Sequence, residues 1–146
     1  SILTAQKNQK DNNINSAMVA SWISQASFSP PGITIAVAKD RAVETLLHNG
    51  DLFALNILNA NDYQKQLKQF LKPFPPGANR LAEINFKYSP QQQPIIPDAL
   101  AWIEGCVKQR MECGDHWVIY AEILHGKVQD QNGITAVHHR RTGANY

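Results

Sequence analysis

The segment SWISQASFSPPGITIAVAKDR, residues 21–41, shows how this chain turns and pairs with itself. Hydroxyl and amide side chains come before two prolines, and the β-branched and small apolar run ITIAVA follows them. Proline has no N–H to donate to a β-ladder, so we expect the chain to turn at residues 30–31 and to continue as a new, buried strand. Simple alternation would put Ser24 and Ser27 on opposite faces of the first strand.

The rest of the chain is also rich in strand signals. β-Branched and aromatic runs between turn residues predict strands at 1–5, 17–23, 33–38, 52–58, 101–106 and 117–124. Near the carboxy terminus, GKVQD and ITAVHH flank QNG (131–133), and the Asn-Gly step predicts a hairpin between them. Strands outnumber helices and do not alternate with them, so we predict a mainly β protein, an antiparallel barrel with a few short helices.

Two stretches have helical spacing. RAVETLLHN places Val43, Leu46 and Leu47 on one face, and NDYQKQLKQFL does the same for a second set of apolar residues, namely Tyr63, Leu67, Phe70 and Leu71. Region 72–98 holds six of the eight prolines, and we interpret it as an excursion over the barrel surface.

Length and composition limit the class of protein. The 146 residues suit one domain, 1–146, and a formal net charge of +2 gives no reason to expect nucleic acid as a partner. No apolar run is long enough to span a membrane, and SILTAQKNQKDNNINS contains no signal-peptide core. Only two cysteines, Cys106 and Cys113, are present, and we interpret both as small core residues of a cytoplasmic protein.

Several common catalytic motifs are missing. The sequence contains no GxGxxG, no GxxxxGK[ST], no GxSxG and no HExxH. The adjacent pair His138 and His139 would point to opposite faces of a strand, so we favour structural or solvated roles for the five histidines and predict no metal site.

The opening segment could bind a flat polar ligand. The backbone groups of residues 25–27 are potentially free for a planar heterocycle, although a polar edge strand leading into a loop explains the same residues. Asp40 is a plausible N-cap for the helix that follows, and a helix start beside Lys39 and Arg41 would suit a phosphate. A capped surface helix with solvated charges is the alternative.

The order of four segments resembles one family. ASWISQASFSPPGITIAVAKDR, GDLFALNIL, QLKQFLKPF and RMECGDHWVIYAEILHGKV together resemble the flavin reductase-like family, the FMN-binding split barrels, across nearly the whole chain. More narrowly, RMECGDHWVIYAE and the ending TAVHHRRTGANY resemble the carboxy-terminal flavin reductase domain of flavodiiron proteins from oxygenic phototrophs. The resemblance implies an antiparallel split β-barrel that forms part of a longer chain, after a di-iron domain and a flavodoxin-like domain.

The resemblance also implies a cofactor site. It assigns the isoalloxazine ring to a run of five residues, Ser24, Gln25, Ala26, Ser27 and Phe28. It assigns the flavin phosphate or ribityl chain to Lys39, Asp40 and Arg41. Phe70 would approach the flavin, or simply complete the apolar face of its helix. His116, in GDH, would orient nicotinamide or contact the reduced flavin, or be a structural residue clamped by Asp115.

The implied activity is hydride transfer from NADH or NADPH to FMN or FAD, with electrons passing on to a flavodiiron core that reduces oxygen. A homodimer is expected, because split-barrel relatives complete the flavin site with a second subunit. Two alternatives remain open. The first is a flavin-binding electron relay or assembly module without nicotinamide activity, in which Trp22, Trp102 and Trp117 could form an interaction surface. The second is a split barrel of the pyridoxamine-phosphate-oxidase type that acts on an amine.

Overall fold

Seven strands form one antiparallel sheet in the order β2-β1-β5-β8-β9-β4-β3. The computed structural model describes residues 1–9, 12–71, 79–82 and 84–137. The strands of this sheet are β1 (Ile2–Gln9), β2 (Asn12–Val19), β3 (Ile23–Phe28), β4 (Pro31–Ala38), β5 (Leu52–Leu58), β8 (Ala99–Cys113) and β9 (His116–Val128). The remaining elements are η1, a 3₁₀ helix (Ala42–Leu46), the helix α1 (Tyr63–Leu71), and a small hairpin of β6 (Lys87–Tyr88) and β7 (Pro94–Ile95).

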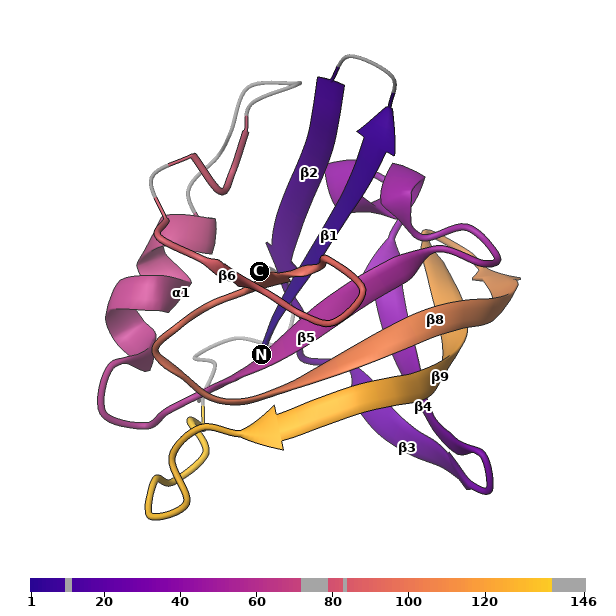
Figure 1. Ribbon diagram of the computed structural model, residues 1–146. Helices are drawn as coiled ribbons and strands as arrows, with labels where there is room; N and C mark the ends of the chain where they lie inside the picture. The colour runs from indigo at the N-terminus through magenta and orange to yellow at the C-terminus, as the bar shows by residue number, and fades with distance from the viewer. Residues whose placement is uncertain (10–11, 72–78, 83, 138–146) are drawn as a thin grey trace.

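The sheet is rolled into a barrel that stays open at one seam. Its two edge strands, β2 and β3, are joined by only three residues, 20–22. Four Cα steps reach at most about 14 Å, so the edges must lie close together although they do not pair with each other. Figure 1 shows the β1–β2 hairpin rising from the same body around which β5, β8, β9 and β4 curve. The fold is therefore the predicted antiparallel split barrel.

The barrel is filled from the inner faces of its strands. Leu3, Phe53, Val37, Val107 and Ile119 are all at most 1% exposed and belong to one cluster. The helix η1 adds Val43 and Leu46 to this cluster and so closes one end of the barrel. A second cluster, which includes Ile2, Leu58 and Phe70, joins α1 to the other part of the sheet.

The strand predictions are confirmed in position but not always in length. The predicted strand at 52–58 matches β5, whereas β8 and β9 extend far beyond 101–106 and 117–124. The predicted strand at 17–23 is wrong, because β2 ends at Val19 and β3 begins at Ile23. The chain must leave one sheet edge and enter the other here, so a single strand cannot cover this segment.

Three other local expectations need correction. The chain does turn after β9, with the N–H of Gly133 donating to the carbonyl of Asp130. The described residues that follow, 134–137, do not pair back on β9, and Thr135 forms a bridge with Asn59 instead. The helix at 42–46 is a single 3₁₀ segment, and Leu71 of α1 is 45% exposed rather than part of the buried face. The interpretation of Cys113 as a core residue is also wrong, since this free thiol is exposed.

Region 72–98 is only partly an excursion over the surface. Residues 72–78 and 83 lie outside the described part of the chain, but Ser89, Gln93 and Ile95 are at most 4% exposed. The Gln6 N–H donates to the Gln93 side chain at 2.9 Å, and Thr4 Oγ1 donates to the Pro94 carbonyl at 2.6 Å. The β6–β7 hairpin is therefore packed against β1. None of the helices that the structure describes is long and apolar enough to cross a membrane.

Candidate functional site

The predicted flavin contacts Ser24 to Phe28 lie on β3, which is an edge strand. Within the described residues no strand pairs with its outer side, so half of its backbone N–H and C=O groups point away from β4. Ser24, Gln25 and Phe28 are exposed, Phe28 at 85%. The edge therefore presents the unpaired backbone groups that a planar heterocycle could contact.

A bulge changes which side chains of β3 share a face. Ser24 pairs with Thr34, and Ser27 pairs with Gly32, with a register shift between Gln25 and Ser27 that leaves Ala26 extra. Thr34 and Gly32 are two residues apart on β4 and point to the same side, so Ser24 and Ser27 do too. The prediction that these two serines lie on opposite faces is wrong, because it ignored the bulge.

This shared side is the outer face of β4, away from the core residues Ile35 and Val37. It carries only small side chains, namely Gly32, Thr34, Ala36 and Ala38. Their partners on β9 are larger: Glu122, Tyr120, Val118 and His116. A methyl group at Gly32 would come within 2.7 Å of the Tyr120 ring, so the ring already lies over this position. We call this strip of small side chains, with Ser24 and Ser27 on one side, the trough on β4.

His116 stands at one end of this trough. It pairs with Ala38, and its Nδ1 is 2.8 Å from Oδ1 of Asp115, which makes the predicted Asp115 contact a real one. The hydrogen bond to His116, followed by the charge on its ring, lowers the pKa of the Asp115 carboxyl. From Thr34, the partner of Ser24, to Ala38 is four strand residues, or about 13 Å, so only an elongated ligand could touch both Ser24 and His116.

The Lys39 amine is not brought to His116. Its backbone N–H donates to the Asp115 carbonyl at 2.9 Å, but its Nζ forms an ion pair with Glu112 and lies 5.3 Å from the centre of the Trp117 ring. Glu112 and Trp117 are register partners, and Trp117 packs against the barrel core. The amine is therefore on the inner side of the sheet, and a phosphate there would compete with Glu112, whose pKa the hydrogen bond to Lys39 lowers.

Asp40 does not cap the helix. The N-cap is Arg41, with φ −84° and ψ 130°, and no side chain bonds to the first turn. Asp40 is exposed, and its Oδ1 is 3.6 Å from Arg41 Nε. A five-residue 3₁₀ segment has little helix dipole, so the start of this helix gives no reason to expect a phosphate there. The positive charge of Arg41 is the part of that expectation that remains.

Arg80 is a candidate that the sequence did not single out. Burial, and then the positive charge of Arg41, lowers the pKa of its guanidinium, so the charge interaction between the two arginines is unfavourable. Arg80 Nη1 donates to the Ala17 carbonyl at 3.1 Å, so its position is fixed against β2. An anion between Arg41 and Arg80 would relieve that repulsion. No sequence motif links two arginines 39 positions apart, and only the fold reveals the pair.

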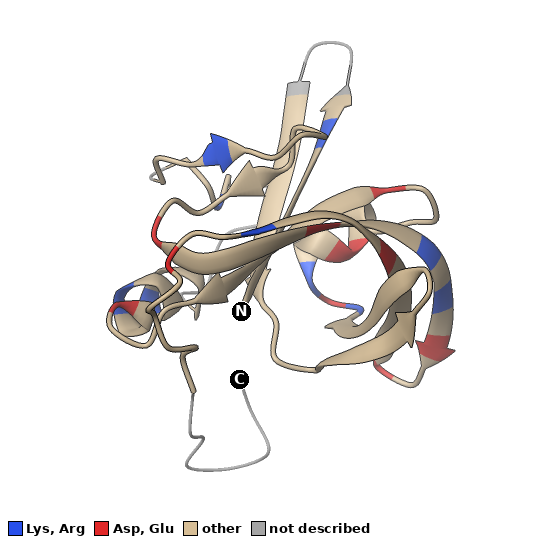
Figure 2. Cartoon of the chain, turned by 60° about the horizontal axis from the view of Figure 1, so that its bottom comes forward, with Lys and Arg blue, Asp and Glu red and all other residues tan. Residues whose placement is uncertain are grey.

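Charge does not otherwise mark a site. In Figure 2 the basic and acidic residues are interspersed over the coloured part of the chain. No group of three or more His, Cys, Asp or Glu side chains among the described residues is arranged to hold a metal ion. His138 and His139 lie outside the described residues.

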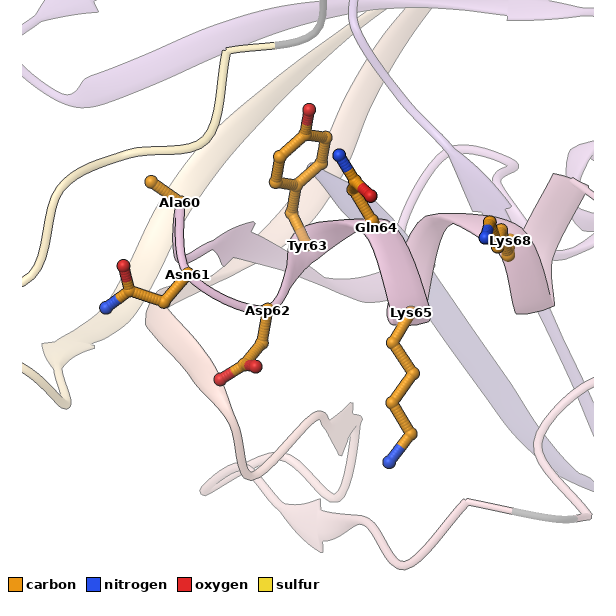
Figure 3. A pocket seen from close by; sticks show the side chains of 7 residues that line it. All are labelled: Ala60, Asn61, Asp62, Tyr63, Gln64, Lys65 and Lys68. Atoms are coloured by element: carbon orange, nitrogen blue, oxygen red, sulfur yellow. The ribbon is translucent and has the colours of Figure 1, made fainter.

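A separate hollow lies at the start of α1. Its volume is about 540 Å³, and Figure 3 shows its lining, which comes from residues 60–65 and Lys68. Tyr63, Asp62 and the two lysines line an open surface, and none of the predicted site residues takes part. We therefore keep the trough on β4 as the candidate site.

Comparison with known proteins identifies the family of the chain. A family model described as "Flavin reductase like domain" matches residues 1–145. The chain is 52% identical over 145 residues to "Diflavin flavoprotein A 1" of Synechocystis sp., covering 99% of this chain and 25% of that protein. It is 53% identical over 137 residues to "Putative diflavin flavoprotein A 6" of Nostoc sp., covering 94% and 24%. The chain thus spans about a quarter of the length of these relatives.

Solved structures share the fold at lower identity. The Streptomyces globisporus C-1027 NADH:FAD oxidoreductase SgcE6 superposes with a TM-score of 0.78 at 22% identity, covering 92% of this chain and 78% of that one. The flavin reductase HpaC complexed with NADP+ gives 0.69 at 22% identity, covering 90% and 80%. At this level of identity the match supports the barrel architecture rather than any residue's role.

Proposed function

Because the chain belongs to the flavin reductase-like family, we propose that it binds FMN or FAD along the trough on β4 and reduces it with NADH or NADPH. The observation that carries the proposal is the bulge in β3. It places Ser24 and Ser27 on the same face as the small side chains Thr34, Ala36 and Ala38, and the Tyr120 ring lies over Gly32 at the end of this strip. When bound, the flavin supplies the redox chemistry, accepting a hydride at N5.

The residues of the chain have positioning roles in this proposal. The unpaired edge of β3, with Ser24 to Phe28, contacts the ring system. Arg41 and Arg80 hold the phosphate, with Lys39 available only if it leaves Glu112. His116, held at Nδ1 by Asp115, keeps Nε2 for a ligand. A hydride needs no protein acid or base, so the work of these residues is to orient both rings and exclude water.

Several large apolar side chains are strongly exposed, among them Trp22 at 53%, Met111 at 58% and Phe28 at 85%. A second copy of the chain would bury these side chains and one side of the flavin, so a homodimer is part of the proposal. Light scattering with and without FMN tests this: a monomer that still binds FMN tightly would contradict it.

The longer relatives suggest a wider role. We propose that this domain, residues 1–146, works in the cytoplasm as the carboxy-terminal part of a flavodiiron protein. It would pass electrons to preceding di-iron and flavodoxin-like domains that reduce oxygen. Oxygen consumption with NADH or NADPH by the full-length chain, lost when this domain is deleted, is the expected result.

One observation favours a different function. Trp22 is stacked on His116 and covers one face of the imidazole, where a nicotinamide would be expected to lie. If that cover is permanent, the domain is a flavin-binding relay or assembly module without nicotinamide activity.

The test is a titration with riboflavin, FMN and FAD, followed by flavin fluorescence, and then anaerobic addition of NADH or NADPH while the oxidised flavin absorbance is monitored. Bound flavin that bleaches supports the reductase, and bound flavin that does not bleach supports the relay. Arg41→Ala should weaken FMN binding and leave riboflavin binding unchanged. Lys65→Ala, in the hollow of Figure 3, should change neither FMN binding nor riboflavin binding. If this variant loses FMN binding, the flavin site lies in the hollow at α1 instead.

A further inference from the structure

A charged pair lies at the end of the trough that is opposite to His116. The Nζ atom of Lys108 is 3.0 Å from Oε2 of Glu122, and the two side chains are 43% and 31% exposed. Glu122 is the register partner of Gly32, the last position of the strip of small side chains. The carboxylate therefore belongs to the face of the sheet that carries the candidate site.

A bulge in β8 accompanies this ion pair. The register of β8 with β9 shifts between Val107 and Gln109, which leaves Lys108 as the extra residue. Bulges re-aim side chains, and the Lys108 amine is directed at Glu122 on the neighbouring strand. The hydrogen bond to Glu122, followed by the charge of this carboxylate, raises the pKa of the Lys108 ammonium, so the amine is charged.

Two hydroxyl groups lie along the same row of the sheet. Ser27 pairs with Gly32, and Gly32 pairs with Glu122, so the three residues form one row across β3, β4 and β9. Neighbouring strands are about 4.8 Å apart, which separates the backbones of Ser27 and Glu122 by about 10 Å. The Tyr120 hydroxyl oxygen would be 2.9 Å from a Cβ atom at Gly32, so it lies over the middle of this row. The end of the trough thus carries two hydroxyls, a carboxylate and an ammonium.

These groups match one edge of a flavin better than the rest of its ring system. The benzenoid part of isoalloxazine is apolar, whereas the pyrimidine part ends in an imide, with the N3–H donor between two carbonyl acceptors. An ionised carboxylate only accepts hydrogen bonds, and an ammonium only donates them. Glu122 has acceptor positions beyond the one that faces Lys108, and Lys108 has two further N–H donors. The pair can therefore bind an N–H group and a neighbouring carbonyl at the same time.

We propose that Glu122 and Lys108 bind the imide edge of the flavin, with Glu122 accepting from N3–H and Lys108 donating to an adjacent carbonyl. This inference rests on the proposed reductase function and deepens it. It gives the ring a direction along β4, with the pyrimidine end at Gly32 and the benzenoid end toward Ala38. The two residues determine specificity, because they distinguish a flavin from a flat ring without an imide. An ion pair that only faces solvent would give no such preference.

The experiment compares riboflavin with N3-methylriboflavin, in which a methyl group replaces the N3–H donor. Flavin fluorescence titrations of the chain give both dissociation constants. The parent should bind the methylated flavin at least about 10-fold more weakly, the lower end of what a hydrogen bond to a charged acceptor contributes. Neither flavin carries a phosphate, so the phosphate contacts proposed for Arg41 and Arg80 do not enter the comparison. Equal dissociation constants would overturn the inference.

Substitutions at Glu122 separate a lost hydrogen bond from a steric clash with the methyl group. Glu122→Leu keeps the bulk of the side chain without an acceptor, so the two flavins should bind within about 2-fold of each other. Glu122→Gln keeps an uncharged oxygen acceptor and should retain an intermediate preference. If Glu122→Leu keeps the full preference for riboflavin, the methyl group clashes elsewhere and the Glu122 contact is wrong.

Lys108→Met gives a different pattern from the Glu122 variants. Its carbonyl partner is the same in both flavins, so both should bind more weakly and by a similar factor. Unchanged binding of both flavins would remove Lys108 from the site.

The matched control is Glu112→Leu. Glu112 also forms an ion pair with a lysine, Lys39, but its register partner is Trp117, on the inner side of the sheet. This variant should bind riboflavin and N3-methylriboflavin as the parent does. A loss of the preference here would show that the effect does not come from a contact with Glu122.

The proposed function and the imide contact fail in different ways. If the parent chain binds neither flavin, the reductase function fails and the imide contact fails with it. If riboflavin binds and bleaches with NADH or NADPH but is not preferred over N3-methylriboflavin, the function is retained and only the imide contact is rejected.

Discussion

Gly105→Ala should destabilise the barrel because Gly105 makes room for Phe53, the largest fully buried side chain among the residues that the structure describes. Gly105 on β8 is the register partner of Phe53 on β5, and a Cβ there would lie 2.6 Å from Cζ and 2.9 Å from Cε1 of the Phe53 ring. Phe53 is 0% exposed, so its ring is enclosed by the core, and protein interiors are close-packed. Either the ring or the β5–β8 pairing must shift.

The size of the effect follows from two opposing contributions. Overpacking a core costs about 1–3 kcal/mol, and a buried ring that cannot yield belongs near the upper end. Alanine recovers about 0.4–1 kcal/mol by restricting the unfolded chain. The net loss is about 2 kcal/mol. With an unfolding entropy of about 2.1 cal/mol/K per residue over 146 residues, Tm should fall by about 7 °C.

Differential scanning calorimetry measures this, with Gly32→Ala as the control. The overlap there is nearly as close, 2.7 Å, but the neighbour is the end of the half-buried Tyr120 ring, which can move aside, so Tm should fall by less than about 3 °C. The double variant Gly105→Ala/Phe53→Leu should lose less than the sum of the single variants. A Tm for Gly105→Ala within 2 °C of the parent, at about the precision of the comparison, would refute the reasoning.

Three more predictions concern other parts of the structure. Glu104→Leu should lower the free energy of unfolding by about 1–3 kcal/mol in urea titrations, because the Ser89 hydroxyl and the Gln91 N–H would lose the buried acceptor to which both donate; an unchanged midpoint would contradict this prediction. The hydrogen bond to His116 lowers the pKa of Asp115, so the stability it adds is present above the carboxyl's ordinary pKa and is lost as the pH falls through the folded value. Asp115→Asn should accordingly make the free energy of unfolding fall less steeply as the pH is lowered. Urea titrations at several acidic pH values measure this, and the same pH dependence in the variant and the parent would count against the prediction. Phe28→Ser, at an 85% exposed position, should leave the free energy of unfolding within about 0.5 kcal/mol of the parent but weaken flavin binding, and equal flavin affinity would remove Phe28 from the site.

The sequence by itself was sufficient for the fold class and the family. β-Branched runs, prolines and the apolar spacing of 63–71 are local signals, and most of them predict the element that forms there, with 17–23 as the exception. The order of four segments was specific enough to indicate a flavin reductase-like barrel, which the family match over residues 1–145 confirms.

The candidate site was predicted only as a set of residues. Ser24 to Phe28 and Lys39 to Arg41 are neighbours in the chain, and nothing in their order tells which side of a sheet each side chain occupies. The tertiary structure decided that Ser24 and Ser27 share a face, that the Lys39 amine pairs with Glu112 on the other side, and that Trp22 covers His116. The reason is physical: a bulge, an ion pair or a ring stack depends on hydrogen-bond register between strands far apart in sequence, and a single extra residue reverses every side chain beyond it.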